Sequence, residues 1–285
     1  MPDIVSSDNP RIKALRRLLR RRGREESGLA LAEGIRLVGE ALEAGVVRDV
    51  YYAPSALAGG HTGRMLVERA SSLAGTPGSG VRVFSVTESL LTACTDTETP
   101  QGIVATVEVP VRDLAEVARG WDGAAGGVVP SLVVVLDRVQ DPGNVGTIMR
   151  AAEAVAAGAL VAVGGTVDFL NPKVLRSAMG AAFRLPLVHA GESGAADAAR
   201  LLAQAGLTIV AAAPRAKLAC FEADLGSRPV AVIVGNEGAG LSEDWEKAAD
   251  LLVSIPMPGR AESLNVSVAT GILLYEVIRQ RSGLT

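Results

Sequence analysis

The sequence predicts an α/β protein, and three observations support this fold class. Strand-like and helix-like stretches alternate along nearly the whole chain of 285 residues, a pattern typical of layered α/β folds. The stretch "SLVVVLD" at 131–137 is almost entirely apolar, as expected of a strand buried on both faces of a parallel sheet. Hydrophobic residues make up 48% of the chain but aromatic residues only 3%, so Ala, Val, Leu and Ile must build the core.

The first part of the chain is expected to contain both helices and strands. The apolar periodicity predicts helices at 10–22, 35–44, 63–73 and from Glu88 onward. The predicted strands lie at 29–32, 46–53, 81–86 and 102–109.

A glycine-rich stretch separates this part from the rest. The residues "GWDGAAGGVVP" at 120–130 are poor material for a helix or a strand. We therefore expect a linker at 110–130 between an N-terminal domain (1–109) and a C-terminal domain (131–285). In the C-terminal domain we expect helices between buried strands, and these strands are predicted at 131–137, 160–163, 207–211, 230–234 and 251–255.

Composition narrows the possible partners. The net charge is −3, so nucleic-acid binding would have to come from local basic patches. Cys94 and Cys220 are isolated, as are the two histidines, which argues against a metal site; a single disulfide stays open, although two scattered cysteines favour a reducing compartment. No signal-peptide core and no run of 18 apolar residues occur, so we expect a cytoplasmic protein with no metal and no membrane partner.

The N-terminal region carries a basic stretch, "NPRIKALRRLLRRRGR" at 9–24, with eight Arg and Lys residues. Asn9 and Pro10 suit the start of a helix, and apolar residues at helical spacing let one face pack while the basic side chains point outward. One interpretation is contact with RNA or DNA phosphates, which arginine binds with a bidentate fork. The alternative is a solvated charged face.

Three junctions between a strand and a helix carry glycines and polar residues. They are "LDRVQDPGNVGTIMRAAEA" (136–154), "VAVIVGNEGAGLSEDW" (230–245) and "LLVSIPMPGRAESLNVSVATGILLYEVIRQR" (251–281), the last with a long helix starting near Asn265. In open α/β sheets ligands bind outside the carboxyl ends of the strands, so these loops are expected to line one crevice. None of them is a dinucleotide fingerprint or a P-loop, which argues against a nucleoside triphosphatase.

Polar residues at these junctions have a purely structural interpretation as well. Asn144, Glu237 and Asn265 each lie where a lone polar residue is more often a helix cap than a catalytic group. Arg150 falls within an almost apolar helical stretch, which indicates a buried arginine with a purpose, because burying its charge is costly. Pairing with Glu153, three residues later, is the structural alternative.

Taken together, the three stretches closely resemble the SpoU (TrmH-like) family of SPOUT RNA 2′-O-methyltransferases. The resemblance covers roughly 132–281, with the motifs in the family's order. The matching residues are Asn144, Gly146 and Arg150 in the first motif, Gly235, Glu237 and Gly240 in the second, and 255–257 with 263–267 in the third.

The N-terminal stretches "SSDNPRIKAL" and "AEGIRLVGEAL" are similar to the substrate-binding domain of the ribosomal-RNA members. The implied fold is a small ribosomal-protein-like α/β RNA-binding domain followed by an α/β trefoil-knot (SPOUT) catalytic domain, an exception to the rule against threaded chains. The residues expected to contact RNA are Arg11, Lys13, Arg16, Arg17, Arg20 and Arg36.

The resemblance also implies a cofactor and a set of site residues. S-adenosylmethionine should bind in the knot without any metal, and members are homodimers whose active site takes residues from both subunits, with the apolar C-terminal helix as the dimer surface. The implied cofactor-binding residues are Gly235, Asn236, Glu237, Gly238, Ile255, Pro256, Met257 and Leu264. The implied catalytic residues are Asn144, Arg150, Glu237, Ser263 and Asn265. Arg150 would either remove the hydroxyl proton or orient the ribose, the former at odds with an arginine pKa above about 12.

The expected function is methyl transfer to a ribose 2′-hydroxyl of RNA, 23S rRNA first of all, in housekeeping or in resistance to a ribosome-targeting antibiotic. A tRNA substrate and a non-catalytic RNA-binding or assembly factor are the alternatives. A Rossmann-type methyltransferase or dehydrogenase is disfavoured, because the predicted strand ending in "VAVGG" at 161–165 offers no acidic residue for a ribose.

Overall fold

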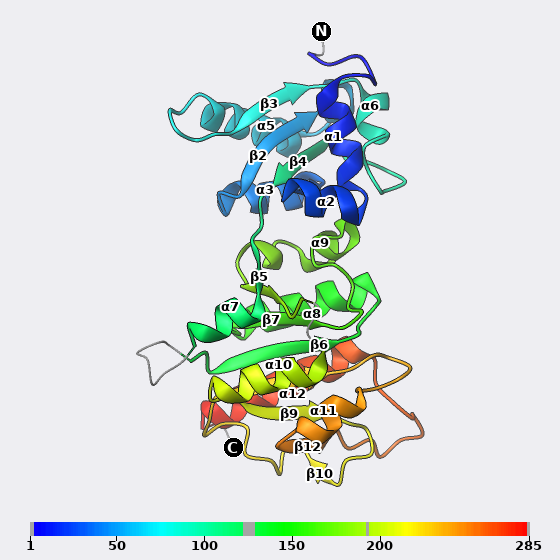
Figure 1. Ribbon diagram of the computed structural model, residues 1–285. Helices are drawn as coiled ribbons and strands as arrows, with labels where there is room; N and C mark the ends of the chain where they lie inside the picture. The colour runs from blue at the N-terminus through cyan, green and yellow to red at the C-terminus, as the bar shows by residue number, and fades with distance from the viewer. Residues whose placement is uncertain (1–2, 122–128, 192–193, 284–285) are drawn as a thin grey trace. The chain divides into compact units, whose positions relative to one another are not determined.

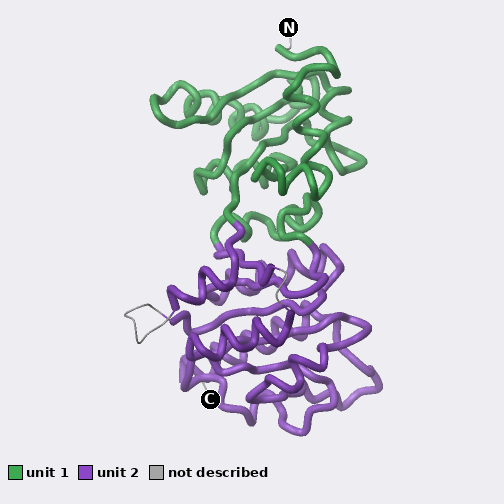
Figure 2. Tube along the Cα trace, in the orientation of Figure 1, with its two compact units in different colours: residues 1–110, 168–184 green, residues 111–167, 185–285 purple. Residues whose placement is uncertain are grey.

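The computed structural model describes residues 3–121, 129–191 and 194–283, which form two compact α/β units (Figures 1 and 2). Unit 1 comprises Met1–Pro110 and Asp168–Arg184, and unit 2 comprises Val111–Val167 and Leu185–Thr285. The glycine-rich part of the expected linker, 122–128, lies outside the described residues.

Unit 1 contains a four-stranded mixed sheet of order β1-β4-β2-β3. The pairs β1/β4 and β4/β2 are antiparallel, whereas β2/β3 is parallel. The central strand β4 is buried along its whole length, so helices must cover both faces. The strands are β1 (Ala30–Glu33), β2 (Val47–Tyr52), β3 (Arg82–Ser85) and β4 (Ile103–Val107).

Six helices of unit 1 precede β4 or connect its strands. Ile12, Leu15 and Leu18 of α1 pack with Leu91 of α6 and Tyr51 of β2 in one core cluster, while α3 and α5 pack on the sheet from the other side. Apart from the first predicted helix, the predicted helices and strands of this part are confirmed, with bounds within two residues. The helices are α1 (Pro10–Leu18), α2 (Arg21–Ser27), α3 (Ile35–Glu43), α4 (Pro54–Leu57), α5 (His61–Ala74) and α6 (Glu88–Thr92).

The basic stretch forms two helices, so the prediction of a single helix at 10–22 is wrong. Asn9 caps α1 as expected, since its side chain accepts a hydrogen bond from the Arg11 amide at 2.9 Å. Arg20 is extended, with φ −105° and ψ 140°, and α2 turns back against α1. A Cβ atom on Gly23 would lie only 2.1 Å from the Arg17 carbonyl oxygen, so this close approach requires glycine.

The segment Asp168–Arg184 belongs to unit 1 although it follows strand β7 (Ala159–Val163) of unit 2 (Figure 2). It contains α9 (Pro172–Ala178) and the short helix η2 (Ala181–Phe183), and α9 packs against β1. Ion pairs fix the segment: Arg24–Asp168 at 2.7 Å, Arg176–Glu33 at 3.2 Å, Arg176–Asp96 at 3.1 Å and Arg184–Glu40 at 2.6 Å. The compact units therefore do not follow the expected boundaries, which placed 131–285 in one domain.

Unit 2 is built on an eight-stranded sheet of order β10-β12-β9-β11-β6-β7-β8-β5, and every pair in it is parallel. The five predicted strands are present, while β5, β8 and β10 escaped prediction because two or three residues are too few to show a pattern. The strands are β5 (Val111–Asp113), β6 (Leu132–Asp137), β7 (Ala159–Val163), β8 (Leu187–His189), β9 (Thr208–Ala212), β10 (Leu218–Ala219), β11 (Val230–Val234) and β12 (Leu251–Ser254).

Helices cover both faces of this sheet (Figure 1). Residues of α7, α10 and α11 form one core cluster with the side chains of one sheet face, and α8 and α12 pack together on the other. In the described part of the chain, no helix is long and apolar enough to cross a membrane. The helices are α7 (Leu114–Arg119), α8 (Pro142–Ala154), α10 (Ala195–Gln204), α11 (Glu243–Ala248) and α12 (Val266–Arg281).

The expected linker at 110–130 begins with regular structure. Strand β5 pairs with β8, and Asp113 caps α7 by accepting hydrogen bonds from the amides of Ala115 and Glu116 at 2.9 and 3.3 Å. Residues 111–119 of the expected linker therefore form a strand and a helix, and the domain boundaries stay a prediction. The linker was predicted from the glycines of 120–130, and this glycine-rich stretch does not include 111–119.

Candidate active site

Four loops of unit 2 leave the carboxyl edge of the sheet side by side. They follow β6, β9, β11 and β12, and β11 lies between β6 and β9. Because all these strands are parallel, their carboxyl ends meet at one edge, where α/β proteins bind ligands.

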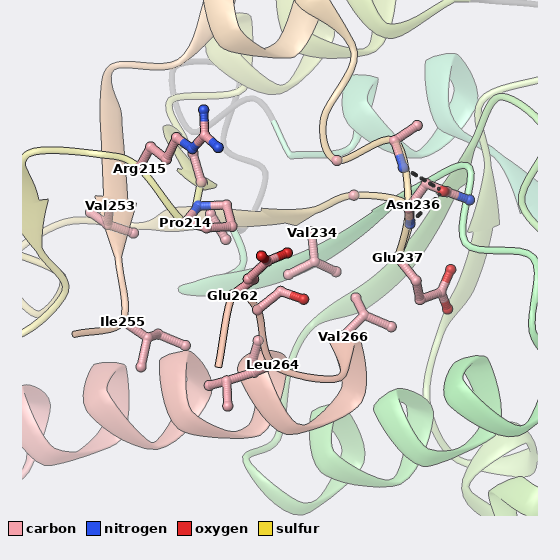
Figure 3. A pocket seen from close by; sticks show the side chains of 18 of the residues that line it. Pro214, Arg215, Val234, Asn236, Glu237, Val253, Ile255, Glu262, Leu264 and Val266 are labelled. Carbon is pink, nitrogen blue, oxygen red and sulfur yellow. Dashed lines mark hydrogen bonds between the residues drawn. The ribbon is translucent and has the colours of Figure 1, made fainter. Parts of the chain in front are cut away.

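An open cavity of about 660 Å³ lies at this edge (Figure 3). Its apolar wall includes Val234 of β11 and Val253 of β12. Ile255 follows β12, Leu264 precedes α12 and Val266 begins it, and these three residues also line the wall. A volume of this size is within the usual range for small-molecule and cofactor sites, about 300–1,000 Å³. Of the eight predicted cofactor-binding residues, Pro256 does not line the cavity. The other seven do: Gly235, Asn236, Glu237, Gly238, Ile255, Met257 and Leu264.

The charged side chains at the cavity are mostly acidic. Glu237, Glu246 and Glu262 line it together with Arg215. An apolar wall with an acidic surplus suits a ligand that carries both an aromatic ring and a positive charge. In the described residues no three potential metal-binding side chains lie together.

The loop after β11 approaches the cavity with its backbone. Asn236 and Gly240 form two reciprocal backbone hydrogen bonds of 3.0 and 2.9 Å, and the Asn236 side chain accepts bonds from the amides of Gly238 and Ala239 at 2.9 Å each. A Cβ on Gly235 would lie 2.5 Å from the Gly240 carbonyl, so the closed loop requires glycine at 235. Gly240 also has a positive φ of 68°, which favours glycine.

The end of β6 holds this loop in place. The buried carboxylate of Asp137 accepts a hydrogen bond from the Ser242 amide at 2.8 Å. Arg138, in the left-handed region with φ 57°, donates to the Gly240 carbonyl at 3.3 Å, and its own carbonyl accepts from the Asn236 side chain at 2.9 Å. The first and second predicted motifs are thus joined by direct hydrogen bonds.

A chain of hydrogen bonds links all three junctions. The side-chain Nδ2 of Asn144 donates to the Glu237 carboxylate at 2.7 Å, and its Oδ1 accepts from the side-chain Nδ2 of Asn265 at 2.9 Å. Asn265 also caps α12 by accepting a bond from the Ser267 amide at 2.9 Å. Asn144 is not the cap of α8. Asp141 caps this helix, because its carboxylate accepts a hydrogen bond from the backbone N–H of Asn144 at 2.8 Å. The cap interpretation therefore accounts for part of the Asn265 side chain and for neither Asn144 nor Glu237.

The other two predicted catalytic residues lie differently. Ser263 lines the cavity. Arg150 does not line the cavity, and its side chain is exposed on α8. The expectation of a buried arginine is therefore wrong. Thr147, three residues earlier on the same side of the helix, is exposed as well.

The predicted RNA-contacting residues lie in unit 1, and their charges are partly neutralised. Lys13 pairs with Asp8 at 2.9 Å and Arg17 pairs with Glu26, while Arg16, Arg20 and Arg36 are exposed. Arg24, counted within the outward basic face, is buried and pairs with Asp168. The basic surface is therefore smaller than the sequence indicated.

Some cavity residues escaped sequence reasoning. Ala212 ends β9 and the residues up to Arg215 follow it, while Glu246 belongs to α11 and Glu262 to the loop before α12. The residues after β9 could have been predicted from the sequence. β9 was a predicted strand, and the loop after a parallel strand begins at the same edge of the sheet as the loops after its neighbours.

Comparisons with known proteins agree with this geometry. Residues 131–275 match the SpoU rRNA Methylase family, and residues 9–105 match the MRM3-like substrate binding domain. A Bacillus subtilis protein named as a 23S rRNA guanosine 2′-O-methyltransferase, RlmP, is 33% identical over 97% of this chain and 99% of its own.

Solved structures give the same result. An S-adenosylmethionine-bound rRNA methyltransferase from Sinorhizobium meliloti has a TM-score of 0.78 and 31% identity over 97% of both chains. The SpoU methyltransferase AviRb from Streptomyces viridochromogenes, in complex with the same cofactor, has a TM-score of 0.78 and 31% identity over 96% of this chain and 98% of its own. The predicted fold class, an α/β N-terminal domain followed by a SpoU domain, is confirmed, while the threading of the knot stays a prediction. The chain belongs to the SpoU rRNA methylase family of RNA methyltransferases.

Proposed function

We propose that this protein transfers a methyl group from S-adenosylmethionine to a ribose 2′-hydroxyl of 23S rRNA in the cytoplasm. The observation that carries the proposal is the hydrogen-bonded chain Glu237–Asn144–Asn265 beside the cavity. It brings polar side chains from three separate strand–helix junctions to one place. The names of the relatives and the cofactor-bound neighbours support the same reaction.

The cavity fits the proposed cofactor. Its apolar wall, with Val234, Ile255 and Leu264, suits an adenine ring, and the acidic surplus of Glu237, Glu246 and Glu262 suits a sulfonium cation. When bound, S-adenosylmethionine supplies an activated methyl group. The closed loop at Gly235 lets backbone groups line the cavity at close range.

A ribose hydroxyl is a weak nucleophile, so the protein must align it and assist the loss of its proton. In this proposal Asn144 and Asn265 fix Glu237 and the ribose in position, and Ser263 hydrogen-bonds the ribose or the cofactor. Arg150 contacts the phosphate and hydroxyl of the target nucleotide, and Glu237 balances its charge. A guanidinium is a better orienting group than a base, because its pKa lies far above neutral pH. The hydroxyl proton therefore passes to solvent as the methyl group is transferred, and S-adenosylhomocysteine is the second product.

The exposed position of Arg150 is explained if the enzyme is a homodimer. Val268, Ile272 and Tyr275 of α12 are 51%, 40% and 62% exposed and follow one another at helical spacing. Such an apolar stripe is typical of a protein interface. Because α8 packs beside α12, a partner on this surface would bring its Arg150 to the neighbouring site.

Labelling with tritiated S-adenosylmethionine tests the function. The purified protein should transfer label to rRNA, and nuclease digestion should release it as a 2′-O-methylnucleoside. Label found only on bases would overturn the proposal. Label found on tRNA but not on rRNA would show that tRNA, and not 23S rRNA, is the substrate. Arg150→Ala should abolish turnover and leave S-adenosylmethionine affinity within about twofold, because Arg150 is not a cavity residue. The resistance role stays a prediction, which antibiotic susceptibility with and without the gene would test.

A further inference from the structure

Unit 1 contains a cavity of its own, of about 290 Å³, between α1, α2 and the sheet. Leu15, Leu18 and Tyr51 form its apolar floor, and all three are at most 3% exposed. Arg11 and Arg17 also line it, together with the carboxylates they pair with, Asp49 and Glu26. An apolar floor beside two ion pairs does not suit a phosphate, because the phosphate would be buried without hydrogen bonds and close to two carboxylates.

Arg11 is held in a position that suits stacking. Its guanidinium lies over the Phe84 ring, 4.2 Å from the ring centroid, and Phe84 stacks on Tyr51 with 5.3 Å between centroids. With one face of the guanidinium on Phe84, the opposite face remains for a second flat group. Unstacked RNA bases bind proteins in this way, on aromatic rings and on guanidinium planes.

The polar groups of the floor are compatible with a base. Asp49 accepts two hydrogen bonds from Arg82, at 2.6 and 2.9 Å, and one from the Tyr51 hydroxyl at 3.1 Å, so its charge is compensated. The Thr106 hydroxyl accepts a bond from the Asp49 amide at 3.0 Å and keeps its own proton to donate. A base edge offers acceptors for such a donor.

We propose that this cavity binds one unstacked base of the RNA substrate, with the base stacked against the guanidinium of Arg11. The inference rests on RNA being the substrate, as in the proposed function. Inserting a base from a duplex would first require that base to be unpaired and unstacked at a cost of about a few kcal/mol, so unit 1 should select single-stranded or looped RNA. The surrounding α1 arginines would then serve the flanking phosphates.

The test compares two probes with the full-length protein. One is a fluorescein-labelled single-stranded RNA of about 12 nucleotides, and the other is the same strand annealed to its complement. Ala14→Phe fills the cavity from an exposed position of α1, and Arg11→Lys keeps the charge but removes the flat guanidinium. The matched controls are Ser71→Phe, on an exposed position of α5, and Arg21→Lys, outside the cavity.

Each cavity variant should weaken single-strand binding about tenfold and leave duplex binding within about twofold, because one stacking contact is lost. The controls should leave both affinities unchanged. The inference is overturned if the unaltered protein has no preference for the single strand. It is also overturned if the cavity variants weaken both probes equally or neither.

These outcomes are independent of the proposed reaction. If rRNA is methylated but Ala14→Phe binds single strands normally, the cavity proposal fails and the enzyme function stands. If no methylation occurs but single-strand selectivity depends on Ala14 and Arg11, the function fails and the cavity proposal stands.

Discussion

Arg24 donates hydrogen bonds to the carboxylate of Asp168, a residue 144 positions later in the chain, at 2.7 and 2.8 Å. The guanidinium is buried, with only 4% of the residue exposed, and it also donates to the Leu18 carbonyl at 2.7 Å. This ion pair joins α2 to the segment Asp168–Arg184, so it closes unit 1 around a piece of chain that enters from the sheet of unit 2.

Removing this pair should destabilise the protein. Arg24→Ala leaves the partly buried Asp168 without its cation and the Leu18 carbonyl without a donor, so we expect a loss of about 3 kcal/mol in the free energy of unfolding. Arg21→Ala is the control, because its pair with Glu25 is exposed and should contribute at most about 0.5 kcal/mol. Urea denaturation followed by circular dichroism measures both. Equal losses in the two variants would contradict the structural role of Arg24.

Two glycines of one loop should differ in their tolerance of a methyl group. Gly235→Ala places a Cβ 2.5 Å from the Gly240 backbone, so the loop must open, and we expect S-adenosylmethionine affinity to fall at least about tenfold. Gly238→Ala meets nothing closer than 3.6 Å, an ordinary contact, and should keep the affinity within about threefold. Calorimetric titration of both variants with S-adenosylmethionine measures these affinities. Similar affinities in the two variants would contradict the prediction and show that the loop adapts to a methyl group at 235.

The strands of unit 2 were predictable because burial on both faces leaves an uninterrupted apolar run. Strand β11 coincides with the predicted 230–234, and β6 differs by one residue. The meeting of Asn144, Glu237 and Asn265 was predictable for a related reason, since each follows a strand whose carboxyl end must lie at the common edge.

Long-range pairing and side-chain direction were not predictable. No local pattern tells that Arg24 meets Asp168, so a basic residue within a basic stretch was assigned to the surface. The exposure of Arg150 was not predicted for the opposite reason. Its apolar neighbours indicated burial, but the small alanines of "MRAAEA" let one side of the helix pack while Arg150 stays exposed on another. Arg215 and Glu262 were missed because nothing in a loop sequence shows which side chains face a cavity.

The amide of Asn144 should matter for turnover more than for cofactor binding. Asn144→Asp keeps the shape, removes the donor to Glu237 and places a second negative charge beside it. We expect kcat to fall about 100-fold and S-adenosylmethionine affinity to stay within about threefold, because Asn144 does not line the cavity. Thr147→Val in the same helix is the control, since the Thr147 hydroxyl donates only to the Gly143 carbonyl. An Asn144→Asp enzyme of normal kcat would exclude the hydrogen-bonded chain from the chemistry.

The two cysteines should be unreactive in the folded protein. Burial raises the pKa of Cys94 to about 11, and burial together with the nearby Glu276 carboxylate raises the pKa of Cys220. Both are therefore protonated thiols at pH 8, whereas the thiolate is the nucleophile. Ellman's reagent should label neither until urea is added, and labelling of Cys94 should accelerate as the pH rises toward 11. Rapid native labelling at pH 8 would show that the side chains are reached through opening of the core.

The exposed stripe of α12 gives a direct test of the dimer. Tyr275 is 62% exposed and follows Ile272 in the apolar stripe, so Tyr275→Glu places a charge within this apolar surface without disturbing the core beneath it. If two copies meet there, burying that charge costs several kcal/mol, and the variant should sediment as a monomer. Met65→Glu, at a 51% exposed residue of unit 1, should leave the association unchanged. Because Arg150 would come from the partner, the monomeric Tyr275→Glu protein should also lose turnover while its cavity still binds S-adenosylmethionine. A monomer with full activity would instead require Arg150 to act within its own chain, which its exposed position on α8 does not explain.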